Sequence, residues 1–287
     1  MHFIVFAALC SVAVSVLLKH CKSQQIDILQ MLAWSYLLAI TLCYVWFQPD
    51  FSHLSLTDTP WWIIAILGLV LPGGFIVLGR SLQRAGVIKT EIAQRLSVIL
   101  SLCAAYLFFN EQLNSLKVMG ICLGLFAMLC LVFSRSDQLA AFRSAAQHQG
   151  AMCSLATVWV IYALVDILLK YTSGLGLQFA VTLNLSFMLA FIFIFSFLIL
   201  RKTQWTIRAM YAGLLLGVVN FANIALYIKA HQWLKDSPSV VFAGMNILVI
   251  LLGAMAGLVF FKERLNRLSS AAIIFATAAI FCLAKAI

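Results

Sequence analysis

The chain has 287 residues, of which 64% are hydrophobic and only 10% are charged, and its mean hydropathy is +1.06. A water-soluble domain carries about 25% charged residues, so this composition excludes a soluble globular protein and indicates a chain surrounded mostly by lipid. The formal net charge of +10 does not indicate nucleic-acid binding, because the basic residues occur singly or in pairs between apolar runs.

Ten apolar runs predict an all-α polytopic membrane protein with ten transmembrane helices. A helix needs about 20 apolar residues to cross a hydrocarbon core of about 30 Å. The runs are continuously apolar rather than alternating, which excludes barrel strands. The predicted spans cover residues 3–18, 31–48, 61–79, 87–109, 116–134, 152–169, 177–200, 209–228, 238–261 and 268–286.

The eight cysteines show no CxxC or CxxH spacing, and most of them lie within the apolar runs, where a thiol behaves as a small hydrophobic group. We therefore expect no metal site, no disulfide framework and no cofactor. The first run lacks a basic leading region and a small-residue cleavage site, so we expect it to span the membrane rather than to be a cleaved signal.

An internal repeat relates the two halves of the chain. Residues 108–131 and 260–283, which differ in number by 152, are identical at ten of 24 positions, including the pairs Glu111/Glu263 and Asn114/Asn266. This predicts a first five-helix repeat in residues 1–135, a connector in 136–150 and a second five-helix repeat in 151–287. Because five is odd, the second repeat must enter the membrane from the opposite side, and such inverted repeats are typical of secondary transporters.

The sequence Phe-Phe-x-Glu-x-Leu-Asn, which precedes a helix rich in small residues in each half, resembles the EamA-type branch of the drug/metabolite transporter superfamily. The resemblance covers the whole chain. It implies an exporter of amino acids, metabolites or drugs in a bacterial inner membrane, with a substrate cavity lined by the first, third, fourth, sixth, eighth and ninth helices. It also implies cytoplasmic termini and a basic connector after the second helix, but the connector 49–60 contains Asp50 and Asp58 and no basic residue.

The distribution of basic residues gives a different orientation from the family pattern. The more basic side of the membrane should be the cytoplasm, which places both termini outside it. The odd-numbered connectors carry Lys19, Lys22, Arg80, Arg84, Lys89, Arg135, Arg143, Arg201, Lys202, Arg208, Lys262, Arg264 and Arg267, whereas the other side carries Lys117, Lys170, Lys229, Lys235 and Lys285.

The predicted fourth helix holds the densest group of polar candidates, namely Glu91, Gln94 and Arg95. Ionisable groups inside a membrane are costly and therefore indicate function. Glu91 and Arg95 have the i, i+4 spacing of a pair on one helix face, so they either contact substrate or neutralise each other. Gln94 and Asn246 are equivalent under the 152 offset, and each either binds substrate or joins helices.

Two polar stripes at helical spacing should face protein or a cavity rather than lipid. One belongs to the predicted sixth helix and the other to the eighth. The stripes consist of Trp159, Tyr162, Asp166 and Lys170, and of Asn220, Asn223, Tyr227 and His231.

The third helix contains Pro72, Gly73 and Gly74, which predict a kink or hinge because proline removes a backbone donor and glycine adds conformational freedom. Glu111 and Glu263 lie at helix ends, where capping or connector packing is favoured over a role in proton transfer.

These patterns together favour a secondary transporter that exports an amino acid or another zwitterionic or amphipathic compound by alternating access, as a monomer or homodimer. Arg95 suits a substrate carboxylate, while Glu91 or Asp166 suits an amine. Protons are the expected coupling ion, through Glu91, Asp166 or His231. The alternatives are an exchanger of phosphorylated sugars or nucleotides, which requires more basic residues at the midplane, an intramembrane enzyme, or a receptor.

The enzyme alternative depends on the HxxxxD spacing of His53 and Asp58. The two residues lie in a twelve-residue connector, 49–60, that has no room for the domain such a motif serves.

Overall fold

The computed structural model describes residues 2–54, 59–84, 87–112, 114–134, 149–175, 178–261 and 267–286. Within these ranges the chain forms ten long α-helices and one 3-10 turn, Phe51–His53, with no strand. The helices are α1 His2–Ser23, α2 Ile28–Phe47, α3 Trp61–Arg84, α4 Val87–Leu107, α5 Ser115–Ser134, α7 Gln149–Ser173, α8 Gln178–Leu200, α9 Ile207–Trp233, α10 Pro238–Phe261 and α11 Arg267–Lys285. Each predicted span overlaps one of them.

The helix ends follow from local chemistry. Asp27 caps α2, because its carboxylate accepts a hydrogen bond of 2.9 Å from the backbone N–H of Leu29. Thr206 caps α9 in the same way through the N–H of Ala209. Helix α10 begins at Pro238, a favoured residue for a first helical position because the N–H that proline lacks would have no partner within the helix there.

Among the described residues, five helices are long enough and apolar enough to cross a membrane. They are Ile28–Phe47, Trp61–Ser81, Met152–Ser173, Gln178–Leu200 and Ile207–Trp233. The other five helices contain shorter apolar stretches of 10–17 residues, His2–Leu18, Ala93–Leu107, Ser115–Cys130, Pro238–Gly253 and Ser270–Lys285.

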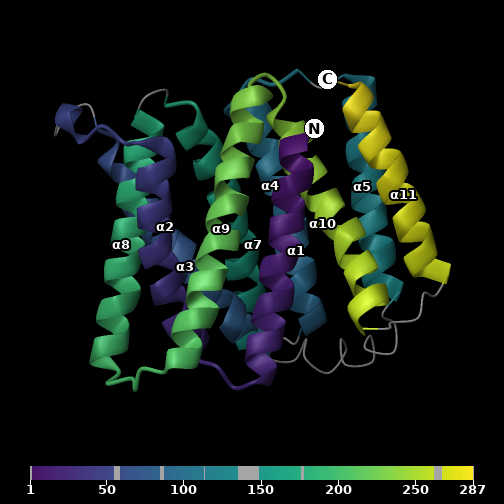
Figure 1. Cartoon of the computed structure of the whole chain (residues 1–287). Helices are drawn as coiled ribbons and strands as arrows, with labels where there is room; N and C mark the ends of the chain where they lie inside the picture. The colour runs from purple at the N-terminus through teal and green to yellow at the C-terminus, as the bar shows by residue number, and fades with distance from the viewer. Residues whose placement is uncertain are drawn as a thin grey trace.

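The helices lie side by side in one bundle, and both chain termini lie at the same end of it (Figure 1). Helix α5 packs against α11, and α2 packs against α8. Helix α9 packs against α1 and α2, α3 packs against α7 and α8, α10 packs against α1, and α4 packs against α7. The two halves of the chain contribute to these contacts in the same way. If α1 to α5 are exchanged in order with α7 to α11, the same pairs of neighbouring helices result.

Glycines allow α9 to lie directly on α2. A Cβ atom on Gly213 would lie 2.6 Å from the carbonyl oxygen of Met31, and one on Gly217 would lie 2.9 Å from that of Ser35. Small residues at such contacts let two helix backbones approach closely, which is a common way to hold membrane helices together. This contact fixes α9, and with it one of the two polar stripes, against the first half of the bundle.

Candidate functional site

The carboxylate of Asp166 joins three helices of the bundle. Asp166 belongs to α7, and its Oδ1 accepts a hydrogen bond of 3.1 Å from the hydroxyl of Tyr227 on α9. Its Oδ2 accepts a hydrogen bond of 3.2 Å from the hydroxyl of Ser101 on α4. One helix of the first half and two helices of the second half therefore meet at a single acidic group.

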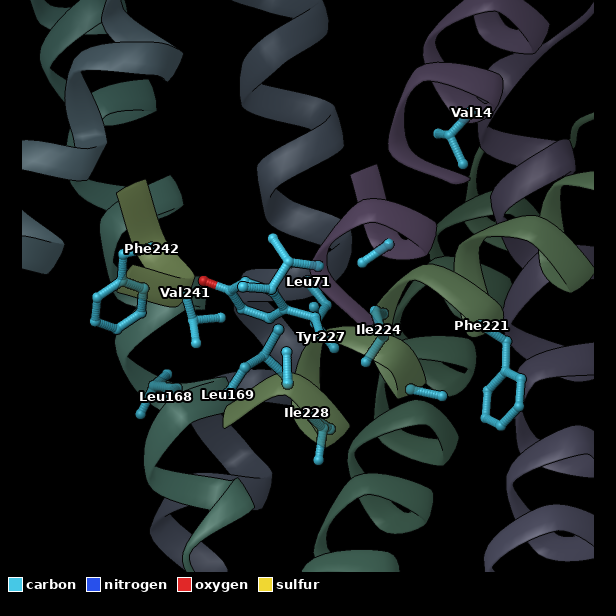
Figure 2. Close-up of a cluster of buried hydrophobic side chains, with 14 of the residues drawn as sticks. Val14, Leu71, Leu168, Leu169, Phe221, Ile224, Tyr227, Ile228, Val241 and Phe242 are labelled. Carbon is cyan, nitrogen blue, oxygen red and sulfur yellow. The ribbon is translucent and has the colours of Figure 1, made fainter. Parts of the chain in front are cut away.

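The position of Tyr227 is fixed by apolar packing. Its ring lies in a cluster of buried aliphatic side chains contributed by several helices, including Leu71 of α3, Leu169 of α7 and Val241 of α10 (Figure 2). Tyr227 is 5% exposed and Ser101 is fully buried. Because both donors are held by their surroundings, the geometry around the Asp166 carboxylate is pre-organised.

The α7 stripe faces α4. The indole Nε1 of Trp159 donates a hydrogen bond of 2.9 Å to the backbone carbonyl of Leu96. Tyr162, one turn further along α7, lies within electrostatic reach of Arg95 on α4. A guanidinium, two aromatic rings and a carboxylate thus lie along the α4–α7 interface.

The α9 stripe contains buried polar atoms without hydrogen-bond partners in the described part of the chain. These atoms are Oδ1 of Asn223 and both ring nitrogens of His231. An unsatisfied buried polar atom is destabilising by about 1–3 kcal/mol, and such atoms in a native structure call for an explanation such as bound water or ligand. Asn220, in the same stripe, is also buried, with 8% of its surface exposed.

His231 is enclosed by aromatic rings. Its ring centroid lies 4.8 Å from that of Tyr227 and 4.9 Å from that of Phe242 on α10. The side chain is fully buried. This contact extends the polar stripe from Asp166 toward the end of the bundle that carries the termini.

The two amides related by the 152 offset differ in their surroundings. The Asn246 amide donates a hydrogen bond of 3.0 Å to the carbonyl of Phe242 in its own helix, so it satisfies one donor without a second helix. Gln94 is half-buried in α4. Glu91 belongs to α4, but its side chain lies outside the described residues, so its pairing with Arg95 stays a prediction.

The predicted hinge lies in a continuous helix. Helix α3 runs from Trp61 to Arg84 through the buried Pro72. A Cβ atom on Gly73 would meet nothing within 4 Å, whereas one on Gly74 would lie 3.4 Å from Ile161 of α7. The helix is therefore unbroken in this conformation, and a hinge role stays a prediction.

Sequence reasoning overlooked Ser101 and Tyr36. Ser101 follows Gln94 and Ser97 at i+7 and i+4, so the polar spacing along α4 was a signal for it. Tyr36 of α2 is 1% exposed, its hydroxyl has no partner among the described residues, and it lies within electrostatic reach of Tyr162. A lone tyrosine in an apolar run gives no such signal.

An apolar groove of about 540 Å³ lies elsewhere, between α2 and α8. Its lining includes Tyr44, Asn184 and Met188, and none of the candidate residues. The amide of Asn184 donates a hydrogen bond of 3.0 Å to the carbonyl of Ile40. The groove therefore offers an incoming polar ligand little beyond apolar contact.

Comparison with known proteins places the chain in a family. Residues 1–133 match the EamA-like transporter family. A Haemophilus influenzae protein described as uncharacterized is 42% identical over 290 residues, which cover 99% of this chain and 97% of that protein. A solved structure, described only as the crystal structure of a protein, has the same fold, with a TM-score of 0.70 at 13% identity over 99% of this chain and 96% of that one. The chain therefore belongs to the EamA-like transporter family of the drug/metabolite transporter superfamily and is an integral, multi-pass membrane protein.

Proposed function

We propose that this protein is a secondary transporter that exports a small zwitterionic molecule, such as an amino acid or a related amphipathic metabolite, across a bacterial inner membrane. The observation that carries the proposal is the Asp166 carboxylate, which is held by hydroxyl groups of α4 and α9 on the same α4–α7 interface that contains Arg95. The substrate binds between these opposite charges.

The chemistry of the interface matches a zwitterion. A charged side chain inside a membrane costs about 2.5–3.5 kcal/mol on insertion scales. Two hydroxyl donors offset part of this cost for Asp166, and a substrate ammonium group offsets more of it. Arg95 binds the substrate carboxylate, because a guanidinium matches the planar, two-oxygen geometry of that group. Trp159 and Tyr162 form an aromatic wall for the apolar part of the substrate.

The internal repeat supports alternating access. Helix α5 begins at residue 115, and adding 152 gives 267, where α11 begins. Helix α4 begins at residue 87, and adding 152 gives 239, one residue after the start of α10. Five helices in each unit and both termini at one end of the bundle (Figure 1) support a second unit that is inverted relative to the first. Two such units exchange conformations around a shared midplane site.

Orientation and coupling complete the proposal. The excess of basic residues in the odd-numbered connectors supports an orientation with both termini outside the cytoplasm. Protons drive transport through Asp166, with His231 and Glu91 as further candidates, because a carboxylate that binds the substrate amine can exchange that amine for a proton.

A ligand screen tests the substrate class. Purified protein is heated with amino acids, with sugar phosphates or with nucleotides, and the unfolding temperature is recorded. Amino acids should raise this temperature, because a ligand that binds only the native state stabilises it. Stabilisation by sugar phosphates or nucleotides alone would contradict the proposal and favour an exchanger of phosphorylated compounds. Chemical conversion of a stabilising ligand would favour an enzyme.

A further inference from the structure

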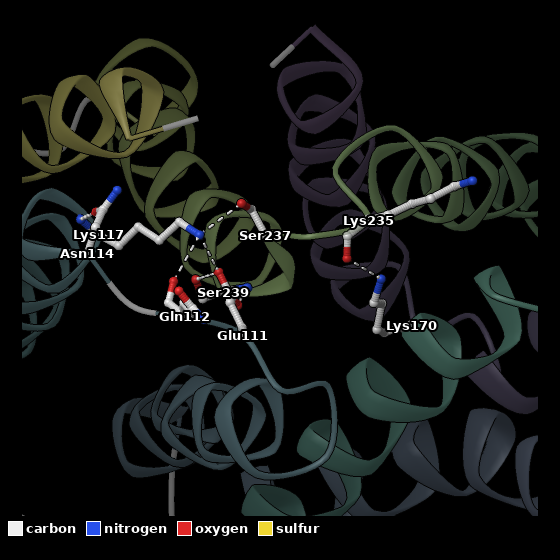
Figure 3. A network of polar contacts seen from close by, with 8 residues as sticks. All are labelled: Glu111, Gln112, Asn114, Lys117, Lys170, Lys235, Ser237 and Ser239. Atoms are coloured by element: carbon white, nitrogen blue, oxygen red, sulfur yellow. Dashed lines mark hydrogen bonds and ion pairs between the residues drawn. The ribbon is translucent and has the colours of Figure 1, made fainter.

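A second polar cluster lies at the end of the bundle that carries the termini (Figures 1 and 3). It contains Glu111 and Lys117 from the α4–α5 connector and α5, and Ser237 and Ser239 from the α9–α10 connector and α10. We call these four residues the latch. It joins the first half of the chain to the second, and the Asp166 site does not include it.

Glu111 caps α10, the fourth helix of the other half. Its Oε2 accepts a hydrogen bond of 2.7 Å from the backbone N–H of Ser239, and its Oε1 accepts one of 2.6 Å from the Ser239 hydroxyl. The first N–H groups of a helix lack partners within it and carry a partial positive charge. A carboxylate supplied by another part of the chain satisfies both needs.

Lys117 neutralises the capping carboxylate and extends the contact. Its Nζ donates a hydrogen bond of 2.9 Å to Oε1 of Glu111 and another of 2.9 Å to the hydroxyl of Ser237. Glu111 is 4% exposed and Lys117 is 6% exposed. The backbone N–H of Lys117 donates a hydrogen bond of 2.8 Å to the side-chain oxygen of Asn114, which fixes the start of α5. The Glu and the Asn of the repeated motif therefore have distinct roles.

A lysine of α7 holds the same connector from its other side. The Nζ of Lys170 donates a hydrogen bond of 3.2 Å to the carbonyl of Lys235 (Figure 3). The same atom lies 5.6 Å from the ring centroid of Phe109. Lys170 is 8% exposed. The α9–α10 connector is thus bound to α5 through Ser237 and to α7 through Lys235.

We propose that the latch is the gate at this end of the transport path, and that it separates whenever the Asp166 site opens toward this end. The proposal rests on the proposed transport function. Buried ion pairs contribute little net stability, since well-packed apolar residues often replace them without loss. They can, however, exchange their partners for water when they separate. A contact between the two halves must form and break in each transport cycle. A buried ion pair suits such a contact better than apolar packing does, because its charges can be hydrated when it separates.

Labelling of a buried cysteine measures whether the latch is closed. Val241 of α10 is fully buried in the apolar cluster that holds Tyr227 (Figure 2) and follows Ser239 of the latch by two residues, so Val241→Cys places a buried thiol within one helical turn of the latch. A membrane-impermeant maleimide is added from the side of the termini, and the labelling of the chain without Val241→Cys is subtracted. No substrate is needed, so the result does not depend on the identity of the substrate.

Glu111→Gln is the principal test. The amide keeps the shape of the cap but leaves the Lys117 ammonium without a counter-ion. We expect the labelling rate to rise about tenfold, which corresponds to about 1.4 kcal/mol in the gating equilibrium. Glu111→Gln with Lys117→Met removes both charges, and the rate should return toward that of the parent. Lys235→Gln is the matched control, because this exposed residue supplies only its backbone carbonyl, and it should leave the rate unchanged.

A folded Glu111→Gln protein that is labelled at the rate of Lys235→Gln would overturn the latch while leaving the proposed transport function intact. If Glu111→Gln does not fold, Ser239→Ala decides the question, because it removes one hydrogen bond and no charge. A faster rate supports the latch, and an unchanged rate overturns it. Glu263→Gln, in the matching position of the other half, should not accelerate labelling from this side.

Discussion

The hydroxyl of Tyr227 on α9 donates a hydrogen bond of 3.1 Å to the carboxylate of Asp166 on α7. Ser101 of α4 donates to the other oxygen of the same carboxylate. A lone carboxylate among apolar helices is unfavourable, and the two hydroxyl donors around Asp166 offset part of that cost.

Substrate binding should depend on the charge of Asp166 more than on its hydrogen bonds. Asp166→Asn keeps the size of the side chain and removes the charge, and we expect the Kd of the amino-acid ligand to rise at least about tenfold. Ser101→Ala removes one neutral hydrogen bond, with an expected effect of about 1 kcal/mol. Isothermal titration calorimetry measures both. Equal effects of the two substitutions would show that Asp166 has only a structural role.

Proton coupling should be lost with the acidic group. An imposed pH gradient drives uptake by the parent protein, and Asp166→Asn should make uptake independent of that gradient, because its amide cannot take up a proton in this pH range. His231→Gln and Glu91→Gln are measured in parallel. If all three variants retain the pH dependence of the parent, protons are not coupled through these residues.

The contact between α2 and α9 should tolerate no side chain at Gly213. A Cβ atom there would lie 2.6 Å from the Met31 carbonyl oxygen, which belongs to the backbone and cannot move independently. Gly213→Ala should therefore destabilise the fold by about 1–3 kcal/mol and lower the unfolding temperature. Gly253→Ala is the control, since a Cβ atom at that position meets nothing within 4 Å. Equal unfolding temperatures for the two variants would contradict the close contact.

Gly73 tests the hinge without a steric complication. A Cβ atom at Gly73 meets nothing within 4 Å, and alanine in a helix is favoured over glycine by about 0.5–1 kcal/mol. Gly73→Ala should leave the unfolding temperature unchanged or raise it while slowing transport several-fold, because α3 bends less easily. Gly253→Ala again serves as the control. Unchanged transport by Gly73→Ala would rule out a requirement for flexibility at this position.

The positions of the helices could be predicted from the sequence, but some of their ends could not. The sequence predicts that the eighth span ends at residue 228, whereas α9 continues to Trp233. Hydropathy falls at Lys229 and His231, but Lys229 lies 5.8 Å from the ring centroid of Phe47 and His231 is enclosed by aromatic rings. A long basic side chain can cover an apolar surface in this way, and no local pattern shows which surface it will meet.

The polar residues of the candidate site could be found by spacing, but their partners could not. Helical periodicity placed Asp166 and Tyr227 in inward-facing stripes, yet the participation of Ser101 depends on how α4 meets α7. The preference for a capping role at Glu111 is confirmed, while the capped helix lies 128 residues away in the sequence. Such contacts arise from the packing of whole helices. Glu263 lies outside the described residues, so its equivalent role stays a prediction.

Transport by purified protein in liposomes tests the central claim most directly. The parent protein should accumulate a radiolabelled amino acid in unchanged chemical form, and Asp166→Asn should reduce accumulation to the level of protein-free liposomes, while Lys235→Gln transports normally. Accumulation by a folded Asp166→Asn protein at the rate of the parent would contradict the assignment of the substrate site to the carboxylate shared by α4, α7 and α9.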